Sequence, residues 1–300
     1  MNVLVEGIGS MVFTTQLKYY TEMKWNIFGI DIDNRTAGWF KVDKPYLVPE
    51  YSDPDCFNVI EEVIQKEKIG LIFPTVNEGL LHWSKRKKKY NDKYNAFVVL
   101  SDEKVISTCV DKWETFQFFT ENRIPTPKTS LDLDYELLKP RVGRGSLGIY
   151  LKKEIKSDLK LEDYISQEIV AGEEYTIDIL CDFRSNPIYI IPRKRMKTAS
   201  GVSVQGKTVC DRKIIEYCRV IVENLKPIGI INIQCFKCGD KIYFIEINPR
   251  IAGGISLSFA ASDNWFKAIE CFLINKQYIP KEIKFNRSMF RYYEDLIVDE

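Results

Sequence analysis

Residues 241–250 have the sequence KIYFIEINPR, which predicts a β-strand that ends before Pro249. Alternation along a strand predicts an apolar face made of Tyr243, Ile245 and Ile247. Glu246 and Asn248 would then share the opposite face near the strand end. A carboxylate and a carboxamide aimed at one point are oxygen ligands that suit Mg²⁺. The alternative is a half-exposed polar edge, but the strand is otherwise apolar, which favours a metal site.

A neighbouring strand is expected to bring a third oxygen ligand to the same place. Residues 230–236 form an apolar strand, and the sequence CGD at 238–240 predicts a hairpin turn between the two strands. Gln234 lies on the first strand, where its side chain would reach the same site. Pro249 turns the chain after the second strand, so Arg250 is expected beside the metal.

Composition excludes several classes of function. The chain has 300 residues, with 43 Lys and Arg against 42 Asp and Glu, and a net charge of +1 gives no global field for nucleic acid or an anionic membrane. Its single histidine, His82, excludes zinc sites built from several histidines and leaves one residue for any Ser-His or Cys-His nucleophile. We expect His82 to be a structural helix residue beside Trp83.

The cysteines and the apolar runs indicate a reducing compartment. Eight cysteines are scattered over a large chain, which predicts reduced thiols. The pair Cys235-x-x-Cys238 has no second pair to complete a zinc site. The N-terminus lacks a basic region before an apolar one, and no apolar run reaches the roughly 20 residues that span a bilayer. We therefore expect a cytoplasmic protein without a membrane partner.

The first hundred residues alternate between short apolar runs and helical patterns. Strands are expected at 2–5, 26–30, 70–73 and 96–100, and helices near 11–22, 54–67 and 77–90. Such alternation predicts βαβ units in a parallel, Rossmann-like sheet. Gly7-x-Gly9 follows the first strand, but Val12 stands where a dinucleotide fingerprint has its third glycine, so we interpret the motif as a tight turn and not as an NAD site.

A second domain is expected to begin after this sheet. Residues 111–122 predict a helix, and the sequence IPTP at 124–127 ends it because proline resists helix. Residues 138–149, LKPRVGRGSLGI, then place three glycines and a serine between two apolar strands. Glycine lets exposed N–H groups approach phosphate oxygens, and Lys139, Arg141 and Arg144 would add charge. The alternative is a plain basic hairpin turn.

Residues 167–178, QEIVAGEEYTID, contain an apolar strand, a glycine turn and an alternating strand. Backbone groups at such a hinge are able to bind a purine edge, and Glu174 to bind ribose hydroxyls, but taken by itself the pattern favours an ordinary hairpin.

Taken together and in this order, the segments resemble the ATP-grasp superfamily, in particular the type found in the large chain of carbamoyl-phosphate synthetase. The matching motifs are Asp-Lys at 111–112, IPTP at 124–127, KPxxGxGS at 139–146, EEY at 173–175, NIQ at 232–234 and EINPR at 246–250. The resemblance implies an α/β and α+β architecture. A Rossmann-like N-terminal domain (1–105) precedes a small lid subdomain (106–170) and a large subdomain with the magnesium site (171–300).

The resemblance also implies a role for each matching residue. Lys112 and Lys139 contact ATP phosphates beneath the glycine-rich lid, where Arg144, Gly145 and Ser146 also bind ATP. The backbone of Glu168, Ile169 and Val170 holds adenine, and Glu174 holds ribose. Gln234, Glu246 and Asn248 bind two Mg²⁺ ions, with Mn²⁺ as an alternative. Arg250 and Lys139 are the catalytic residues, and Arg250 faces the transferred phosphoryl group. Residues 74–78 (PTVNE) line the substrate side.

The implied activity is that of an ATP-dependent carboxylate–amine ligase acting on small, amino-acid-like substrates through an acyl phosphate. Such chemistry relies on positioning and charge, and it needs no histidine base. The family's synthetase carries a further arginine where this chain has Gly253, which argues against carbamoyl phosphate synthesis. The alternatives are a phosphotransferase of the same fold and a non-catalytic ATP-binding protein. Related folds often form dimers, so a homodimer stays open.

Two basic clusters need separate interpretation. Residues 85–89 (KRKKK) are interpreted as the solvated end of a helix and not as a nucleic-acid site. Arg193, Lys194, Arg195 and Lys197 follow a predicted strand, and we expect them on a loop through Gly206 that faces the phosphates or the acceptor.

Overall fold

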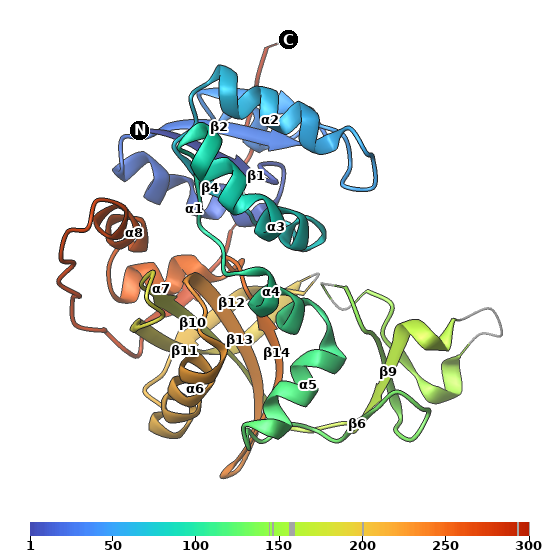
Figure 1. Cartoon of the computed structure of the whole chain (residues 1–300). Helices are drawn as coiled ribbons and strands as arrows, with labels where there is room; N and C mark the ends of the chain where they lie inside the picture. Colours follow the sequence, from blue (N-terminus) through green and yellow to red (C-terminus); the bar gives the residue numbers. More distant parts are fainter. Residues whose placement is uncertain (144, 146, 156–159, 200, 293, 300) are drawn as a thin grey trace.

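The computed structural model contains three β-sheets, shown in Figure 1, and describes residues 1–143, 145, 147–155, 160–199, 201–292 and 294–299. One sheet belongs to the N-terminal domain, a small sheet lies to one side, and a large antiparallel sheet forms the centre of the remainder. No helix within the described ranges is both long enough and apolar enough to cross a membrane.

The N-terminal sheet is parallel, as its alternation of strands and helices predicts. Its order is β3-β2-β1-β4-β5. The strands are β1 (Asn2–Glu6), β2 (Asn26–Asp31), β3 (Lys44–Leu47), β4 (Leu71–Phe73) and β5 (Phe97–Val98), and the helices are α1 (Met11–Glu22), η1 (Ala37–Phe40), α2 (Cys56–Lys66) and α3 (Asn77–Tyr94). Strand β3 was not predicted, because Pro45 weakens a strand pattern; β3 occupies the sheet edge, where proline is tolerated.

The small sheet is antiparallel and carries the glycine-rich turn. Its order is β6-β9-β7-β8, from β6 (Thr129–Ser130), β7 (Leu137–Pro140), β8 (Tyr150–Leu151) and β9 (Tyr164–Gln167), with the short helices η2 (Lys152–Glu154) and η3 (Leu161–Asp163). The turn joins β7 to β8, as predicted. Two of its predicted ATP-binding residues, Arg144 and Ser146, lie outside the described residues.

The large sheet has the order β14-β13-β10-β11-β12-β15 and is antiparallel. Its strands are β10 (Glu173–Cys181), β11 (Pro187–Ala199), β12 (Val202–Thr208), β13 (Gly229–Cys238), β14 (Lys241–Asn248) and β15 (Ser288–Phe290). The helices of this part are α6 (Arg212–Leu225), α7 (Ile255–Ala261) and α8 (Trp265–Leu273). The prediction that 193–197 form a loop was wrong, because these residues continue β11, and Gly206 lies within β12.

Helices α4 (Glu103–Val110) and α5 (Lys112–Glu121) pack against this large sheet. Cys109 and Phe119 share a buried core with Ile233 and Phe244 of β13 and β14, and the N–H of Phe244 donates to the carbonyl of Pro125 at 2.8 Å. Much of 106–127, predicted to belong with the lid, therefore shares its core with the large sheet.

Strand β14 contains one extra residue. Gln234 pairs with Glu246, but the next residue, Cys235, pairs with Phe244, so Ile245 has no cross-strand partner. Such a bulge reverses the faces of a strand beyond it. Ile242 and Phe244 lie in the core before it, and Ile247 lies in the core after it. The predicted apolar face of Tyr243, Ile245 and Ile247 was therefore wrong, although Glu246 and Asn248 do share a face.

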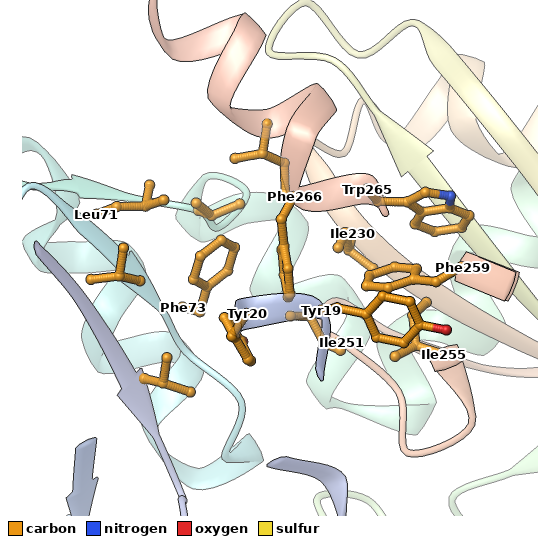
Figure 2. Close-up of a cluster of buried hydrophobic side chains, with 14 of the residues drawn as sticks. Tyr19, Tyr20, Leu71, Phe73, Ile230, Ile251, Ile255, Phe259, Trp265 and Phe266 are labelled. Carbon is orange, nitrogen blue, oxygen red and sulfur yellow. The ribbon is translucent and has the colours of Figure 1, made fainter. Parts of the chain in front are cut away.

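A continuous apolar core joins the N-terminal domain to the large sheet (Figure 2). Tyr20 of α1 and Phe73 of β4 lie around Phe266 of α8, and the rings of Tyr20 and Phe266 stack with centroids 4.3 Å apart. Polar contacts frame this core: Trp25 Nε1 donates to Glu270 Oε1 at 2.9 Å, and Asn264 Nδ2 donates to the carbonyl of Tyr19 at 2.8 Å. This shared burial holds the two parts in one fixed relation.

We expect Phe266→Ala to lower the free energy of unfolding by about 3–5 kcal/mol. The substitution leaves a cavity between two domains, and the surrounding side chains cannot move far enough to fill it. Urea denaturation followed by tryptophan fluorescence measures the change. Phe290→Ala is the matched control, because Phe290 is 68% exposed. Equal stability of the two variants would contradict a core shared between the domains.

Candidate functional site

A cleft of about 730 Å³ lies between the glycine-rich turn, the large sheet and the N-terminal domain. It brings together most of the residues that the sequence singled out, although they come from elements far apart in the chain. The predicted site residues that line it are Lys112, Lys139, Gly145, Glu168, Ile169, Val170, Glu174, Gln234, Glu246, Asn248 and Arg250. Lys139 and Glu246 thus face one space, from the small sheet and the large sheet respectively.

Three oxygen-bearing side chains meet on β13 and β14. Gln234 and Glu246 are direct cross-strand partners, and Asn248 is two residues further on the same face. One carboxylate and two amide carbonyls are hard oxygen donors, a set that fits a Mg²⁺ ion completed by waters and phosphates. Within the described ranges no group of three or more His, Cys, Asp or Glu residues is placed to hold a metal.

The ammonium of Lys139 lies buried in the cleft. Its Nζ donates to Gln167 Oε1 at 2.6 Å, and Gln167 Nε2 donates to Thr129 Oγ1 at 2.9 Å, which fixes the orientation of the Gln167 amide. Burial lowers the pKa of Lys139 to about 8, while the charge of Glu246 opposes this shift and the charge of Lys112 adds to it. An anion entering the cleft would stabilise the charged form of this lysine.

Lys112 begins α5 beside the glycine-rich turn. The side chain of Asp111 caps the helix by accepting from the N–H of Trp113 at 2.8 Å, and the N–H of Lys112 donates to the carbonyl of Arg141 at 2.9 Å. The guanidinium of Arg141 donates to both Asp111 oxygens, one of them at 2.6 Å. Arg141 thus fixes the start of the turn to α5, and the phosphate contact expected of it stays a prediction.

The opposite end of the cleft is apolar. Glu168, Ile169 and Val170 connect β9 to β10, and Ile169 is 54% exposed there. Further side chains from both sheets line the same end: Leu137, Ile149, Phe236 and Ile245. Ile245, the extra residue of β14, was predicted to share an apolar face with Tyr243 and Ile247, and the structure instead places it in the lining of the cleft. A flat heterocycle fits a surface of this kind.

Two arginines of β11 also line the cleft. They are Arg193 and Arg195, which belong to the second basic cluster of the sequence. Arg195 donates to the carboxylate of Glu174 and, through Nη2, to the carbonyl of Gly201 at 2.7 Å. Arg193 donates to both oxygens of the buried Asp178, at 2.6 and 2.9 Å. Lys194 instead pairs with Glu173. Arg193 and Arg195 line the cleft, and alternation places Lys194 on the other face. The pairing of β11 with β12 becomes irregular after Arg195, so the alternation does not extend to Lys197.

Asp178 is the centre of a buried polar network that sequence reasoning missed. Besides Arg193, its carboxylate accepts from Asn232 Nδ2 at 2.7 Å and Ser258 Oγ at 2.5 Å. Asn232 also donates to Thr176 Oγ1 at 2.6 Å. The three partners of Asp178 come from β11, β13 and α7, so no local pattern in the sequence predicts the network. It supports the floor of the cleft under Asn248, the cross-strand partner of Asn232.

Arg250 joins the large sheet to the N-terminal domain. Its Nε donates to Asn77 Oδ1 at the start of α3, and its Nη2 donates to Asn248 Oδ1 at 3.3 Å. Thr75 and Val76 of the segment 74–78 also line the cleft. Asn77 was not singled out, because only the folded chain brings it to Arg250.

Other features singled out in the sequence are accounted for by local contacts. The N–H of Gly9 donates to Asp31 Oδ2 at 2.6 Å, so this turn is held by the protein itself. Lys87, Lys88 and Lys89 of the basic run each pair with a carboxylate, from Asp102, Asp92 and Glu61. His82 stacks against Tyr51 and Phe57.

Comparison of the sequence with known proteins gives a match to one family model and matches to curated relatives. Residues 160–286 match the model of a family described as ATP-grasp in the biosynthetic pathway with Ter operon. Over 236 residues the chain is 24% identical to the carbamoyl phosphate synthase large chain of Campylobacter jejuni, a match that covers 67% of this chain. It covers 21% of that relative, so the chain corresponds to about a fifth of the longer protein.

Solved structures give the same answer for the fold. The biotin carboxylase domain of the 2-oxoglutarate carboxylase of Hydrogenobacter thermophilus, in complex with MgADP and bicarbonate, superposes with a TM-score of 0.73 at 16% identity, over 96% of this chain and 73% of that one. The L-amino acid ligase of Bacillus licheniformis superposes with a TM-score of 0.68 at 14% identity, over 91% and 74% of the two chains. At such identities the likeness shows the fold alone.

We expect Glu246→Gln to lower the pKa of Lys139 below its value of about 8, because the charge of Glu246 raises that pKa in the intact cleft. The rate of amine acylation at Lys139 as a function of pH, read by mass spectrometry of the labelled peptide, measures the midpoint. Glu168→Gln is the control: this carboxyl also lines the cleft but is not among the groups that shift Lys139. An unchanged midpoint in Glu246→Gln would show that the two side chains do not share one electrostatic environment.

Proposed function

Because the chain is an ATP-grasp protein related to the large chain of carbamoyl phosphate synthase, we propose that it is an ATP-dependent ligase that joins a carboxylate to an amine. The observation that carries the proposal is the shared cleft. Lys139 enters it beside the glycine-rich turn, and Gln234, Glu246 and Asn248 enter it from the large sheet. Cations on one side and oxygen ligands on the other suit a triphosphate held with magnesium.

The nucleotide would occupy the half of the cleft between the two sheets. The apolar end at Ile169, Phe236 and Ile245 suits adenine, and the backbone of 168–170 would supply its hydrogen-bond partners. Glu174 would bind ribose hydroxyls, which requires the carboxylate to exchange its partner Arg195 for the sugar. Lys112 and Lys139 would then lie along the phosphates.

Magnesium would be held by Glu246 with Gln234 and Asn248, and it would supply charge neutralisation for the transferred phosphoryl group. Glu246 would also help to hold a second Mg²⁺ ion. Asn248 Oδ1 now accepts from Arg250, so its use as a ligand would free Nη2 of Arg250 for a phosphoryl or carboxylate oxygen. Lys139 would be held fully charged by the phosphates, which offset the burial that lowers its pKa.

The reaction itself balances in two steps. A carboxylate oxygen of the substrate attacks the γ-phosphorus of ATP, the bond to the β-phosphate oxygen breaks, and ADP leaves. The neutral amine then attacks the carbonyl carbon of the acyl phosphate, phosphate leaves, and the amine loses one proton. Water competes with the amine at the second step, so the glycine-rich turn must cover the site while the acyl phosphate exists.

Amino-acid-like substrates are the proposed class. Besides the residues assigned to the nucleotide and magnesium, the cleft is lined by Arg250 and by small side chains such as Val12 and Ala252. The guanidinium of Arg250 would suit the carboxylate of such a substrate. A named ligase of this fold joins amino acids, and the same reaction class is inferred here.

Glu246→Ala should reduce ADP release by roughly 10²–10³-fold, the usual cost of removing one electrostatic contact from a transition state. The assay supplies ATP, Mg²⁺ and paired amino acids, and measures both ADP and the amide product. Asp240→Asn is the matched control, because Asp240 lies at the exposed tip of the same hairpin. A phosphorylated product in place of an amide would identify a phosphotransferase. ATP binding equal in wild type and Glu246→Ala, without turnover in either, would overturn the proposal.

A further inference from the structure

Arg250 is oriented from outside the large sheet. Its guanidinium lies between Asn248, at the end of β14, and Asn77, the first residue of α3. The Nε of Arg250 donates to Asn77 Oδ1, and its Nη1 donates to the carbonyl of Ile251 at 3.1 Å. The direction in which Arg250 points therefore depends on where the N-terminal domain holds Asn77.

The segment that carries Asn77 is fastened by one buried carboxylate, Glu6, at the end of β1. A single oxygen of Glu6, Oε2, accepts from the N–H of Thr75 at 2.6 Å and from the N–H of Val76 at 2.7 Å. The hydroxyl of Thr75 also donates to the carbonyl of Glu6 at 2.7 Å. Asn77 follows directly, so these three bonds fix the chain that presents it.

The other oxygen of Glu6 is fixed as well. Oε1 accepts from Trp83 Nε1 at 2.9 Å, and this indole nitrogen also lies 3.0 Å from the hydroxyl of Tyr51. Trp83 is fully buried and Glu6 is 4% exposed, so no solvent replaces these bonds. Both oxygens of the Glu6 carboxylate are therefore satisfied by donors from the 75–76 backbone and from Trp83, so this side chain holds the segment and the indole together.

We propose that Glu6 is a positioning residue for the reaction: in its ionised form it holds Thr75 and Val76, and through them Asn77, so that Arg250 stays directed at the phosphoryl end of the cleft. The inference rests on the proposed function only in what it assigns to Arg250. The chain of contacts from Glu6 to Arg250 is independent of the substrate.

The state of Glu6 changes near neutral pH. Burial raises its pKa to about 7, against the opposing effect of the bonds from Trp83, Val76 and Thr75, and the charge of Glu78 on α3 raises it further. From α2 the thiol of Cys56 faces it, with its own pKa raised to about 11 chiefly by burial. The phenol of Tyr51 completes this environment, with His82 stacked on Tyr51 and Arg86 over the Phe57 ring.

The sign of the effect follows from the hydrogen bonds. Above a pH of about 7 Glu6 is a carboxylate and accepts every bond described. Below it, a proton on one oxygen turns that oxygen into a donor facing N–H groups, so at least one bond to the 75–76 backbone or to Trp83 is lost. Turnover should therefore fall as the pH decreases through about 7, with a larger change in kcat than in the KM for ATP.

The first test is the pH profile of ADP release in wild type and Glu6→Gln. We expect an inflection near pH 7 in wild type, and in Glu6→Gln a kcat at least 10-fold lower at pH 8 without that inflection. Glu61→Gln is the matched control: Glu61 accepts from Lys89, Tyr90 and Tyr94, away from the cleft. A Glu6→Gln profile that keeps the inflection would overturn the inference.

Asn77→Ala tests the same chain at a less buried position and serves if Glu6→Gln does not fold. It should lower kcat about as much as Glu6→Gln, and the double variant should lose little more, because both changes release the same arginine. Additive losses, or wild-type turnover in Asn77→Ala, would contradict the inference.

A measurement without turnover separates this inference from the proposed function. In ¹⁵N spectra the Trp83 indole signal and the Arg250 Nε–H signal should shift together with a midpoint near pH 7, and neither should titrate there in Glu6→Gln. If both titrate together but no substrate pair releases ADP, the proposed function fails and the positioning stands. A titrating Trp83 with a stationary Arg250 signal would overturn the positioning alone.

Discussion

The unpaired residue Ile245 in β14 controls the direction of every side chain that follows it in the strand. Before it, Ile242 and Phe244 fill the core under α5 and α6; after it, without the extra residue, Glu246 and Asn248 would face that same core. A carboxylate buried there without partners would cost several kcal/mol. With the bulge, both polar side chains enter the cleft beside Gln234, and Ile245 itself becomes part of the apolar end.

A second constraint is the apolar core shared by α1, β4 and α8. It buries Tyr20, Phe73 and Phe266 between the N-terminal domain and the large sheet (Figure 2). Because this core is closely packed, the domains do not slide relative to one another without losing contacts. That rigidity lets a hydrogen bond between Asn77 and Arg250 have a defined geometry across the domain boundary. The N-terminal domain thus helps to build the site.

Most acidic side chains in and around the cleft form ion pairs with arginines of the protein itself. Glu174 pairs with Arg195, Asp178 with Arg193, and Asp111 with Arg141. Lys139 has no such ion pair among the described contacts and relies on Gln167, and its pKa falls to about 8 by burial. A buried cation with a neutral partner is the group most stabilised by an incoming anion. The charges of the cleft therefore favour binding of an anion in the space between Lys139 and Glu246.

Sequence alone determined the elements that depend on local pattern. The parallel N-terminal sheet, the hairpin turn at 238–240 and the glycine-rich turn after β7 all follow from periodicity and turn residues, which act between near neighbours. The set of residues facing the cleft was also largely anticipated, because each belongs to a recognisable short motif. Their proposed roles, which no geometry alone assigns, await the experiments described above.

Only the tertiary structure decided what depends on partners distant in the chain. The bulge at Ile245 is invisible in the alternation of 241–250, because it exists only relative to β13. The pairing of Arg141 with Asp111 joins residues 30 positions apart, and residues 193–197 form a strand because β12 pairs with them. Glu6 and Asn77 carry no motif. Their importance comes from a hydrogen-bonded chain that joins residues 6, 75–77 and 250, and such contacts form only when the sheets pack together.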